Sequence, residues 1–246
     1  MRFDNRVVVL TGVGREGQVG EAVARGFAER GAMVVLVDRQ PTEVSQRAAA
    51  LKAAGFRAWG FTADLTDPQQ VEEVARRTAA AHGGQVDYLV NAAGGFAGSG
   101  RVAESDIAVF QRQLAVNLTT AYLATRAFLP LVRTAKGAVL YFASEAALPD
   151  GRAAGISAYA AAKAGVLALM RAVAQEERDA GVRANALAPG AIRTAANVQG
   201  GDAGPFVERE DVVQAVLYLC SPKARAVTGQ VLRLEPRMDG RSETRR

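Results

Sequence analysis

The chain has 246 residues, of which 49% are hydrophobic and 22% charged, and it carries a formal net charge of +5 and a single cysteine. This composition is typical of a globular protein of one domain; it excludes a disulfide framework, and neither a signal-peptide pattern nor a membrane-spanning run is visible. The positive charge comes from scattered arginines, which indicates a solvated surface rather than a nucleic-acid interface. We therefore expect a cytoplasmic protein without membrane or nucleic-acid partners.

The first elements predicted are a strand, a glycine-rich loop and a helix. Residues 6–11 form a short apolar run, as in a buried parallel strand, and a helical pattern follows the loop. Glycines allow backbone amides to approach a pyrophosphate, and a helix N-terminus stabilises its negative charge. The loop therefore predicts a dinucleotide site at Gly12, Gly17 and Gly20, although these glycines would also fit a tight turn.

A second strand is predicted over residues 33–38, and it ends in Asp38. In a doubly wound fold, a carboxylate at this position accepts a hydrogen bond from the 2′-hydroxyl of the adenosine ribose. It would repel a 2′-phosphate, so we predict NAD(H) in preference to NADP(H). Arg15 and Arg39 are the counter-argument, since either guanidinium could bind that phosphate. A solvated aspartate at a strand end is the remaining alternative.

A third strand is expected between two helices. The three ranges are 42–54, 57–62 and 69–82. Thr66 or Asp67 is expected to cap the second helix, with Pro68 in its first turn. His82 stands at the end of that helix, where we expect a solvated cation rather than a catalytic group.

The fourth predicted strand, residues 86–91, leads into a glycine-containing turn. A long helix follows over residues 105–133, and Asn117 lies in one of its apolar segments, where a buried amide needs partners. The fifth strand, residues 137–144, places Ser144 at its C-terminal end. Open α/β sheets bind their ligands at this edge.

The pattern from Ile156 onward predicts a helix with Tyr159 and Lys163 on one face, because residues four apart lie one turn from each other. An adjacent ammonium favours the phenolate and lowers the pKa of a tyrosine, which makes it a better acid–base catalyst. The hydroxyl of Ser144 could hold a carbonyl or alcohol oxygen against that phenol. By itself, such a pair is more often a core tyrosine beside a lysine that reaches the surface.

The remaining elements are a strand, a glycine-rich segment, a helix and a last strand. Their ranges are 182–188, 191–209, 210–220 and 230–234. Glycines and a proline oppose helix formation in the segment 191–209, so we expect a mobile lid. Selectivity would then depend on residues 145–157, where Arg152 could bind an acidic group. Strands that alternate with helices predict a parallel sheet covered on both faces, a doubly wound α/β fold.

Seven short motifs, in order along the chain, resemble those of short-chain dehydrogenases/reductases of the single-domain subgroup. They are Thr11-Gly12 with Gly17 and Gly20, Asp64-Leu65, Asn91-Ala-Ala-Gly94, Asn117, Ser144, Tyr159-x-x-x-Lys163 and Asn185-Ala-Leu-Ala-Pro189-Gly190. The match runs from Arg6 to about Leu234 and implies a Rossmann-type fold. We expect one catalytic domain over residues 1–237 and a charged, disordered tail over residues 238–246.

The resemblance implies catalytic roles for four residues. Tyr159 would donate a proton to a carbonyl in reduction or accept one from an alcohol in oxidation. Lys163 would bind the nicotinamide ribose and lower the pKa of Tyr159. Ser144 would hydrogen-bond the reacting oxygen, and Asn117 would hold a water of a proton relay. The resemblance implies no metal, and it implies a cofactor site made of Gly12, Gly17, Val19, Gly20, Asp38, Asp64, Leu65, Asn91, Ala92, Gly94, Tyr159, Lys163, Pro189, Gly190, Ile192 and Thr194.

Three departures from the family pattern accompany these motifs. The glycine loop holds extra residues, with Gln18 in place of its middle glycine, so the loop differs from the family pattern where the pyrophosphate is expected. Extra residues between Ser144 and Tyr159 bring charged side chains into the expected substrate loop. The usual Asp-Gly-Gly ending, which forms a common subunit contact in the family, is replaced from Glu235 onward.

We therefore interpret the chain as an NAD(H)-dependent oxidoreductase that interconverts a small secondary alcohol and a ketone. The alternatives are an NADPH-dependent 3-oxoacyl-thioester reductase and a non-catalytic nucleotide-binding sensor or scaffold, which would not need Tyr159. Family members pair their long apolar helices, so we expect a homotetramer, with a dimer as the alternative.

Overall fold

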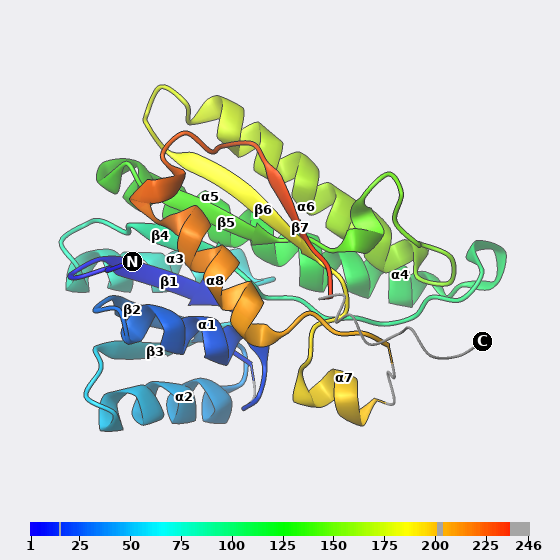
Figure 1. Cartoon of the computed structure of the whole chain (residues 1–246), viewed down its shortest axis with the longest axis horizontal. Coiled ribbons are helices and arrows are strands. Elements are labelled where there is room, and N and C mark those ends of the chain that lie inside the picture. The colour runs from blue at the N-terminus through cyan, green and yellow to red at the C-terminus, as the bar shows by residue number, and fades with distance from the viewer. Residues whose placement is uncertain (15, 201–203, 237–246) are drawn as a thin grey trace, which may run out of the picture.

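A computed structural model of the chain describes residues 1–14, 16–200 and 204–236, and its centre is a parallel sheet of seven strands (Figure 1). The strands are β1 (Val7–Thr11), β2 (Met33–Asp38), β3 (Ala58–Thr62), β4 (Tyr88–Asn91), β5 (Ala138–Phe142), β6 (Arg183–Pro189) and β7 (Val231–Leu234). Across the sheet they follow the order β3-β2-β1-β4-β5-β6-β7. The order runs outward from β1 in one direction and from β4 in the other. The predicted doubly wound fold is therefore confirmed, and its switch point lies between these two strands.

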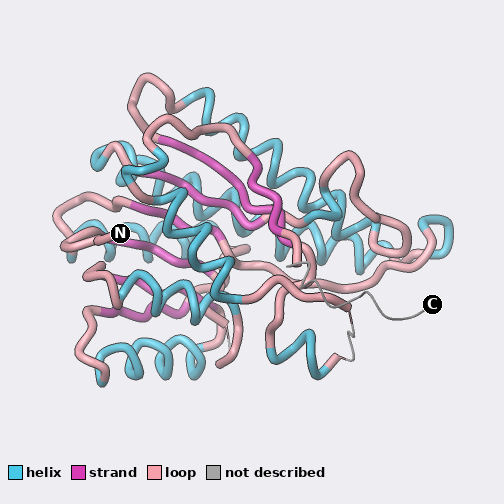
Figure 2. Tube along the Cα trace, in the orientation of Figure 1, coloured by secondary structure: helices cyan, strands magenta, loops and turns pink. Residues whose placement is uncertain are grey.

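Helices cover both faces of the sheet, and Figure 2 shows the strands as one layer between them. One face packs against α1 (Val19–Ala28), α2 (Pro41–Ala53) and α8 (Arg209–Cys220), and the other against α3 (Pro68–Ala81), α5 (Thr120–Ala135) and α6 (Ser157–Glu176). Successive strand residues point to opposite faces, so a continuous apolar run fills both cores. In β1, Val8 and Leu10 belong to the first core, whereas Val7 and Val9 belong to the second.

The long helix predicted over residues 105–133 contains a π-helical turn. It begins as α4 (Ile107–Leu114), widens over Ala115–Thr119, and continues as α5. Asn117 lies in the widened turn and is 1% exposed. Such turns insert a residue into the helical ladder and are frequent at functional sites. The periodicity of the sequence predicted the helix but not this turn.

The N-terminal end of α3 is as predicted, whereas its C-terminal end is not. Asp67 caps the N-terminus by accepting from the amide of Gln69 at 2.9 Å, and Pro68 occupies the first turn, as predicted. The prediction that His82 is a solvated cation is wrong. Its ring meets Trp59 edge-on at 4.7 Å, and burial lowers its pKa.

Within its described residues, the lid segment contains a short helix, α7 (Ala195–Gln199), which the sequence did not predict. Thr194 stabilises it as an N-cap, because its hydroxyl accepts from the amide of Asn197 at 3.2 Å. The expected tail, residues 238–246, lies outside the described residues. Cys220 is buried, and no helix in the described part of the chain has the length and apolar character to cross a membrane.

Candidate active site

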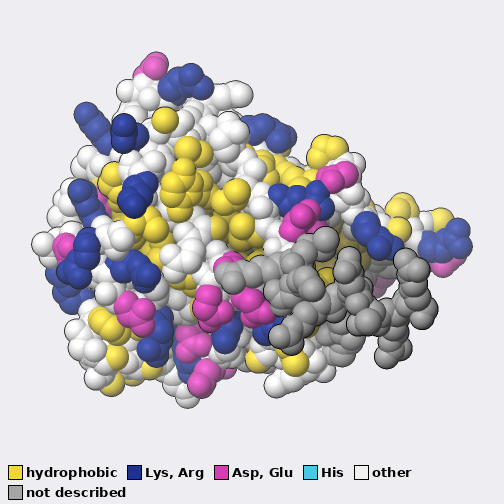
Figure 3. Space-filling model, in the orientation of Figure 1, with side chains coloured by type: hydrophobic (Ala, Val, Ile, Leu, Met, Phe, Trp, Pro, Cys, Tyr) yellow, Lys and Arg dark blue, Asp and Glu magenta, His cyan; other side chains and the backbone are white. Residues whose placement is uncertain are grey.

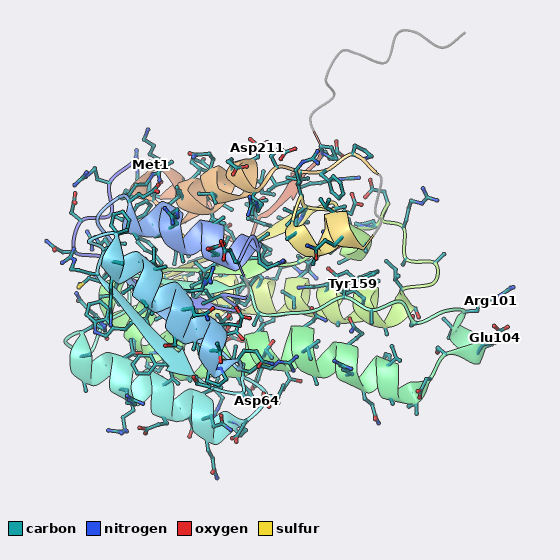
Figure 4. All side chains as sticks on the ribbon, turned by 90° about the horizontal axis from the view of Figure 1, so that it is seen from below. Met1, Asp64, Arg101, Glu104, Tyr159 and Asp211 are labelled. Carbon is teal, nitrogen blue, oxygen red and sulfur yellow. The ribbon has the colours of Figure 1, made fainter. Side chains whose placement is uncertain are left out.

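Helix α6 carries Tyr159 and Lys163 on one face, with Nζ of the lysine 5.8 Å from the centre of the phenol ring. Figure 4 labels Tyr159 on this helix and Asp64 beyond β3, both on the side of the molecule where the strands end. Lys163 is 5% exposed and donates a hydrogen bond of 2.7 Å to the carbonyl of Phe142, the last residue of β5. Burial disfavours its charged form and lowers the pKa of Lys163 from 10.5 to about 8.

Ser144 follows β5 and is buried, and its hydroxyl lies close enough to Tyr159 to lower the pKa of the phenol. Its Oγ also accepts from the amide of Ala146 at 3.3 Å. The expectation that Lys163 lowers the pKa of Tyr159 is wrong for the protein alone. Burial raises the pKa of Tyr159, and the nearby hydroxyl of Ser144 opposes that rise only in part. The ammonium is directed at the carbonyl of Phe142, so the phenol gains little from its charge.

Asn117 clamps the turn that follows β4. Its side-chain oxygen accepts from the amide of Gly95 at 3.2 Å, and its Nδ2 donates to the carbonyl of Gly95 at 2.9 Å. The same nitrogen donates to both oxygens of Gln113, at 3.1 Å to the backbone and 3.2 Å to the side chain. The buried amide therefore has the partners that the sequence required, and the π-helical turn brings it to them.

A cavity of about 280 Å³ opens where the first four strands end. It is lined by Gly12, Asp38, Arg39, Ala63, Asp64, Leu65, Thr66, Ala93, Gly94, Gly95, Phe96, Ala97, Arg112, Gln113, Val116 and Thr120. The cavity therefore joins Gly12, Asp38, Asp64, Leu65 and Gly94, five residues predicted to bind the cofactor. Ligands of doubly wound sheets occupy this crevice.

Two carboxylates hold the enlarged glycine loop. Asp38 accepts from the amide of Gly14 at 2.9 Å, and Glu21 of α1 accepts from the amide of Gly17 at 2.7 Å. Arg47 of α2 donates to Glu21 at 2.8 Å and keeps only 11% of its side chain exposed. Sequence reasoning missed this pair because its members lie 26 residues apart. The predicted amide of Gly17 is thus already bonded within the protein.

The N-terminus of α1 fits a pyrophosphate. Gln18 stands at the cap position without a side-chain hydrogen bond to the first turn, so the described residues leave amides such as that of Val19 to a ligand. Gly20 must be glycine, because a Cβ atom there would collide with the carbonyl oxygens of Gly12 and Val13. The residues at this end of the sheet therefore suit a dinucleotide.

Three residues predicted to bind the cofactor lie at the end of β4 and in the turn that follows it. Asn91 is buried and donates to Thr125 Oγ1 at 3.1 Å, while its Oδ1 has no partner among the described residues. Ala92 lies directly after it and is partly exposed. A Cβ atom on Gly94 would lie 2.6 Å from Asn117 Oδ1 and 3.4 Å from Lys163 Nζ, so glycine is required between these side chains.

Pro189 ends β6, and residues 190–194 follow it along the same edge. Gly190 donates to the carbonyl of Leu234 at 3.0 Å, which ties the turn after Pro189 to β7. Ile192 forms an isolated bridge with Val207, and the hydroxyl of Thr194 is engaged in capping α7. The segment is held at both ends, as a wall of a cofactor site needs.

The expected substrate loop, residues 145–157, carries an ion pair that the sequence did not predict. Arg233 of β7 donates to Asp150 at 2.6 Å and also pairs with Glu235 at 2.8 Å. Arg152, predicted to bind an acidic group, is exposed. A second unpredicted residue is Phe96, whose signal was an aromatic side chain directly after glycines at the ligand edge.

Comparisons with known proteins agree with this fold. A family model described as short chain dehydrogenase matches residues 6–203. The chain belongs to the short-chain dehydrogenase family. As a member of that family it is an NAD(P)-dependent oxidoreductase. Within the described residues, no group of three or more histidine, cysteine or acidic side chains could hold a metal ion.

Two curated dehydrogenases and one solved structure show the extent of the similarity. 2-(S)-hydroxypropyl-CoM dehydrogenase 3 of Xanthobacter autotrophicus is 34% identical, and the match covers 93% of this chain and 94% of the relative. Meso-2,3-butanediol dehydrogenase of Serratia marcescens is 33% identical, covering 93% and 92%. A crystal structure of a short-chain dehydrogenase/reductase from Burkholderia xenovorans superposes with a TM-score of 0.87 at 33% identity, covering 98% of this dehydrogenase and 99% of that chain.

Proposed function

We propose that this protein is an NAD(H)-dependent dehydrogenase that interconverts a secondary alcohol and a ketone, with Tyr159 as the general acid and base. The observation that carries the proposal is the placement of the Ser144 hydroxyl beside Tyr159 at the ligand edge, with Lys163 one helical turn away. Both curated relatives are named for secondary-alcohol groups, a 2-hydroxypropyl group and 2,3-butanediol.

Ser144 and Tyr159 together offer two hydroxyls to one substrate oxygen. When bound, the nicotinamide ring supplies or accepts the hydride at the substrate carbon. In ketone reduction, Tyr159 gives its proton to the forming alkoxide. Its raised pKa keeps the phenol protonated at neutral pH, which suits this direction. In alcohol oxidation the same oxygen must accept the proton, so the oxidation rate should rise with pH.

Lys163, one helical turn after Tyr159 on α6, would bind ribose hydroxyls of the cofactor beside the phenol. Its ammonium is already buried and oriented by the carbonyl of Phe142, so little reorganisation is needed. Asn117 fixes the turn containing Gly94 and Gly95. In addition, Asn117 would hold a water molecule of the proton relay. These two residues thereby link the phenol to the cofactor side of the site.

The remaining cofactor assignments follow the sheet edge. Gly12, Val19 and Gly20 would hold the pyrophosphate, and Asp64 with Leu65 would contact adenine. The further cofactor residues are Gly17, Asn91, Ala92, Gly94, Pro189, Gly190, Ile192 and Thr194. Gly17 would act through the shape of the loop, since its amide already donates to Glu21.

NAD(H) is preferred over NADP(H) in this proposal because the Asp38 carboxylate lines the cavity and would repel a 2′-phosphate. Arg39 lines the same cavity and is the observation in favour of NADP(H). Arg15, also considered for this role, lies outside the described residues. Dissociation constants of NADH and NADPH, measured by fluorescence titration, decide between them. Tighter binding of NADPH would show that the arginine prevails.

Assembly into a homotetramer is part of the proposal, and two exposed apolar faces support it. Ile107, Phe110 and Tyr122 are exposed along α4 and α5. Tyr218 and Leu232 are exposed on α8 and β7, over which Figure 3 shows hydrophobic side chains gathered. Two separate faces allow a dimer of dimers. Light scattering at micromolar concentration should report a tetramer, and a monomer would exclude this assembly.

Activity is tested with purified protein, NAD and NADP, and panels of secondary alcohols and ketones. We expect absorbance changes at the nicotinamide wavelength with NAD and a secondary alcohol, or with NADH and a ketone. Turnover of no member of either panel would contradict the proposed function.

A further inference from the structure

Phe96 is a large apolar side chain left 67% exposed in the loop after β4. One exposed apolar residue is ordinary on a protein surface. This ring, however, lies against the residue proposed as proton donor. The ring centres of Phe96 and Tyr159 are 5.2 Å apart with their planes at 81°, an edge-to-face contact. Phe96 therefore covers part of the phenol while its outer surface faces solvent.

The backbone on both sides of Phe96 is fixed. Gly95 exchanges two hydrogen bonds with Asn117, at 3.2 and 2.9 Å. The amides of Ser99 and Gly100 donate to the carbonyl of Gly155, at 2.8 and 3.0 Å. The loop thus spans from the catalytic asparagine to the expected substrate loop, with Phe96 between the two anchors. A fixed backbone keeps the Cα atom of Phe96 at a distance from which its ring reaches Tyr159.

The site has a polar side, which carries two hydroxyls, and an apolar side, which is formed by the ring of Phe96. Tyr159 and Ser144 offer hydroxyls to the reacting oxygen, whereas Phe96 offers no hydrogen-bonding group beside them. A hydroxyl-bearing substituent placed against the ring would lose partners in water and gain none. An aromatic or branched apolar substituent would replace water on the exposed ring surface and add edge or face contacts.

We propose that Phe96 determines substrate specificity as the apolar wall beside Tyr159, and that the protein prefers secondary alcohols and ketones with an aromatic or branched apolar substituent on the reacting carbon. Polyols are the disfavoured class. The inference rests on the proposed function, because it assumes that the reacting carbon lies at Tyr159.

The test compares 1-phenylethanol with butan-2-ol and a polyol, sorbitol, using wild type and Phe96→Ala. Wild type should have the highest kcat/KM for 1-phenylethanol. An aromatic contact of this kind is worth about five- to tenfold in binding. Phe96→Ala should therefore lower kcat/KM for 1-phenylethanol by that factor, mainly through KM, and change butan-2-ol by less than about twofold. Phe96→Leu should fall between the two.

A matched control is Val102→Ala, because Val102 lies in the same loop and is 73% exposed. This variant should leave the substrate ranking unchanged. Calorimetric titration of the protein–NAD⁺ complex with acetophenone forms a dead-end complex in which no hydride can be transferred, so its readout is independent of turnover. Phe96→Ala should weaken this binding by about five- to tenfold.

The outcomes separate this inference from the proposed function. If wild type oxidises secondary alcohols but Phe96→Ala affects all of them equally, Phe96 is no specificity residue and the proposed function stands. A wild-type preference for sorbitol also overturns the inference alone. Absence of turnover with every alcohol and ketone overturns both.

Discussion

Replacing Lys163 with methionine should stabilise the protein while removing its activity. Methionine fills a similar volume without a charge. The buried ammonium has a pKa of about 8 in the folded protein, against 10.5 for a free lysine. Each pKa unit corresponds to about 1.4 kcal/mol, so the charged form costs the folded state about 3 kcal/mol at neutral pH. The hydrogen bond to Phe142 is lost in the variant and offsets about 1 kcal/mol of this gain.

The sign of the pH dependence follows from proton binding. Below pH 8, Lys163 is charged in both the folded and the unfolded state, and the folded state carries the full cost. Between about pH 8 and 10.5 the folded protein has released the proton while the unfolded chain retains it, so wild-type stability rises with pH. Above that range both states are neutral and the cost has gone.

Urea unfolding of wild type and Lys163→Met at pH 7 and pH 10 measures this difference. At pH 7 the variant should be more stable by about 2 kcal/mol, or about 4–8 °C in Tm for a chain of this size. At pH 10 most of the advantage should disappear. Lys52→Met, at an exposed position of α2, is the control and should change stability by less than about 0.5 kcal/mol at both pH values. A variant that is less stable at pH 7, or equally stabilised at both pH values, would refute the reasoning.

Three further predictions concern the glycine loop, the lid and the substrate loop. Arg47→Met leaves the Glu21 carboxylate without its cation, so the dissociation constant of NADH should rise about tenfold or more, while kcat at saturating cofactor stays unchanged. An unchanged dissociation constant of NADH would exclude a role for the Arg47–Glu21 pair in cofactor binding. Amides of α7 should exchange faster than those of α6 in the free protein and slow down with cofactor and substrate, and full protection without ligand would exclude a moving lid. Arg152→Ala should raise KM selectively for carboxylate-bearing ketones, whereas a uniform rise for all substrates would exclude Arg152 from substrate recognition.

Local patterns in the sequence predicted the fold and much of the site. The apolar runs of β1 and β2 predicted buried parallel strands, and helical spacing placed Tyr159 and Lys163 on one face. Ser144 could be placed because a strand in such a sheet ends at the ligand edge. Each of these inferences depends only on neighbouring residues and on the rules of parallel sheets.

The features that escaped prediction depend on contacts between distant segments. Arg47 meets Glu21 only after α2 packs beside α1, and Arg233 meets Asp150 across 83 residues of sequence. The raised pKa of Tyr159 follows from burial, which a helical spacing cannot report. Helix α7 formed against the glycine content of its segment because Thr194 caps it.

The role of Tyr159 is tested most directly by comparing kcat of wild type and Tyr159→Phe under saturating cofactor. The substitution removes one hydroxyl and leaves a ring that can still contact Phe96, so the fold should be preserved. Loss of the proton donor should lower kcat by about 100-fold or more, with the dissociation constant of NADH nearly unchanged. Retention of most of the wild-type kcat in Tyr159→Phe would contradict the proposed mechanism.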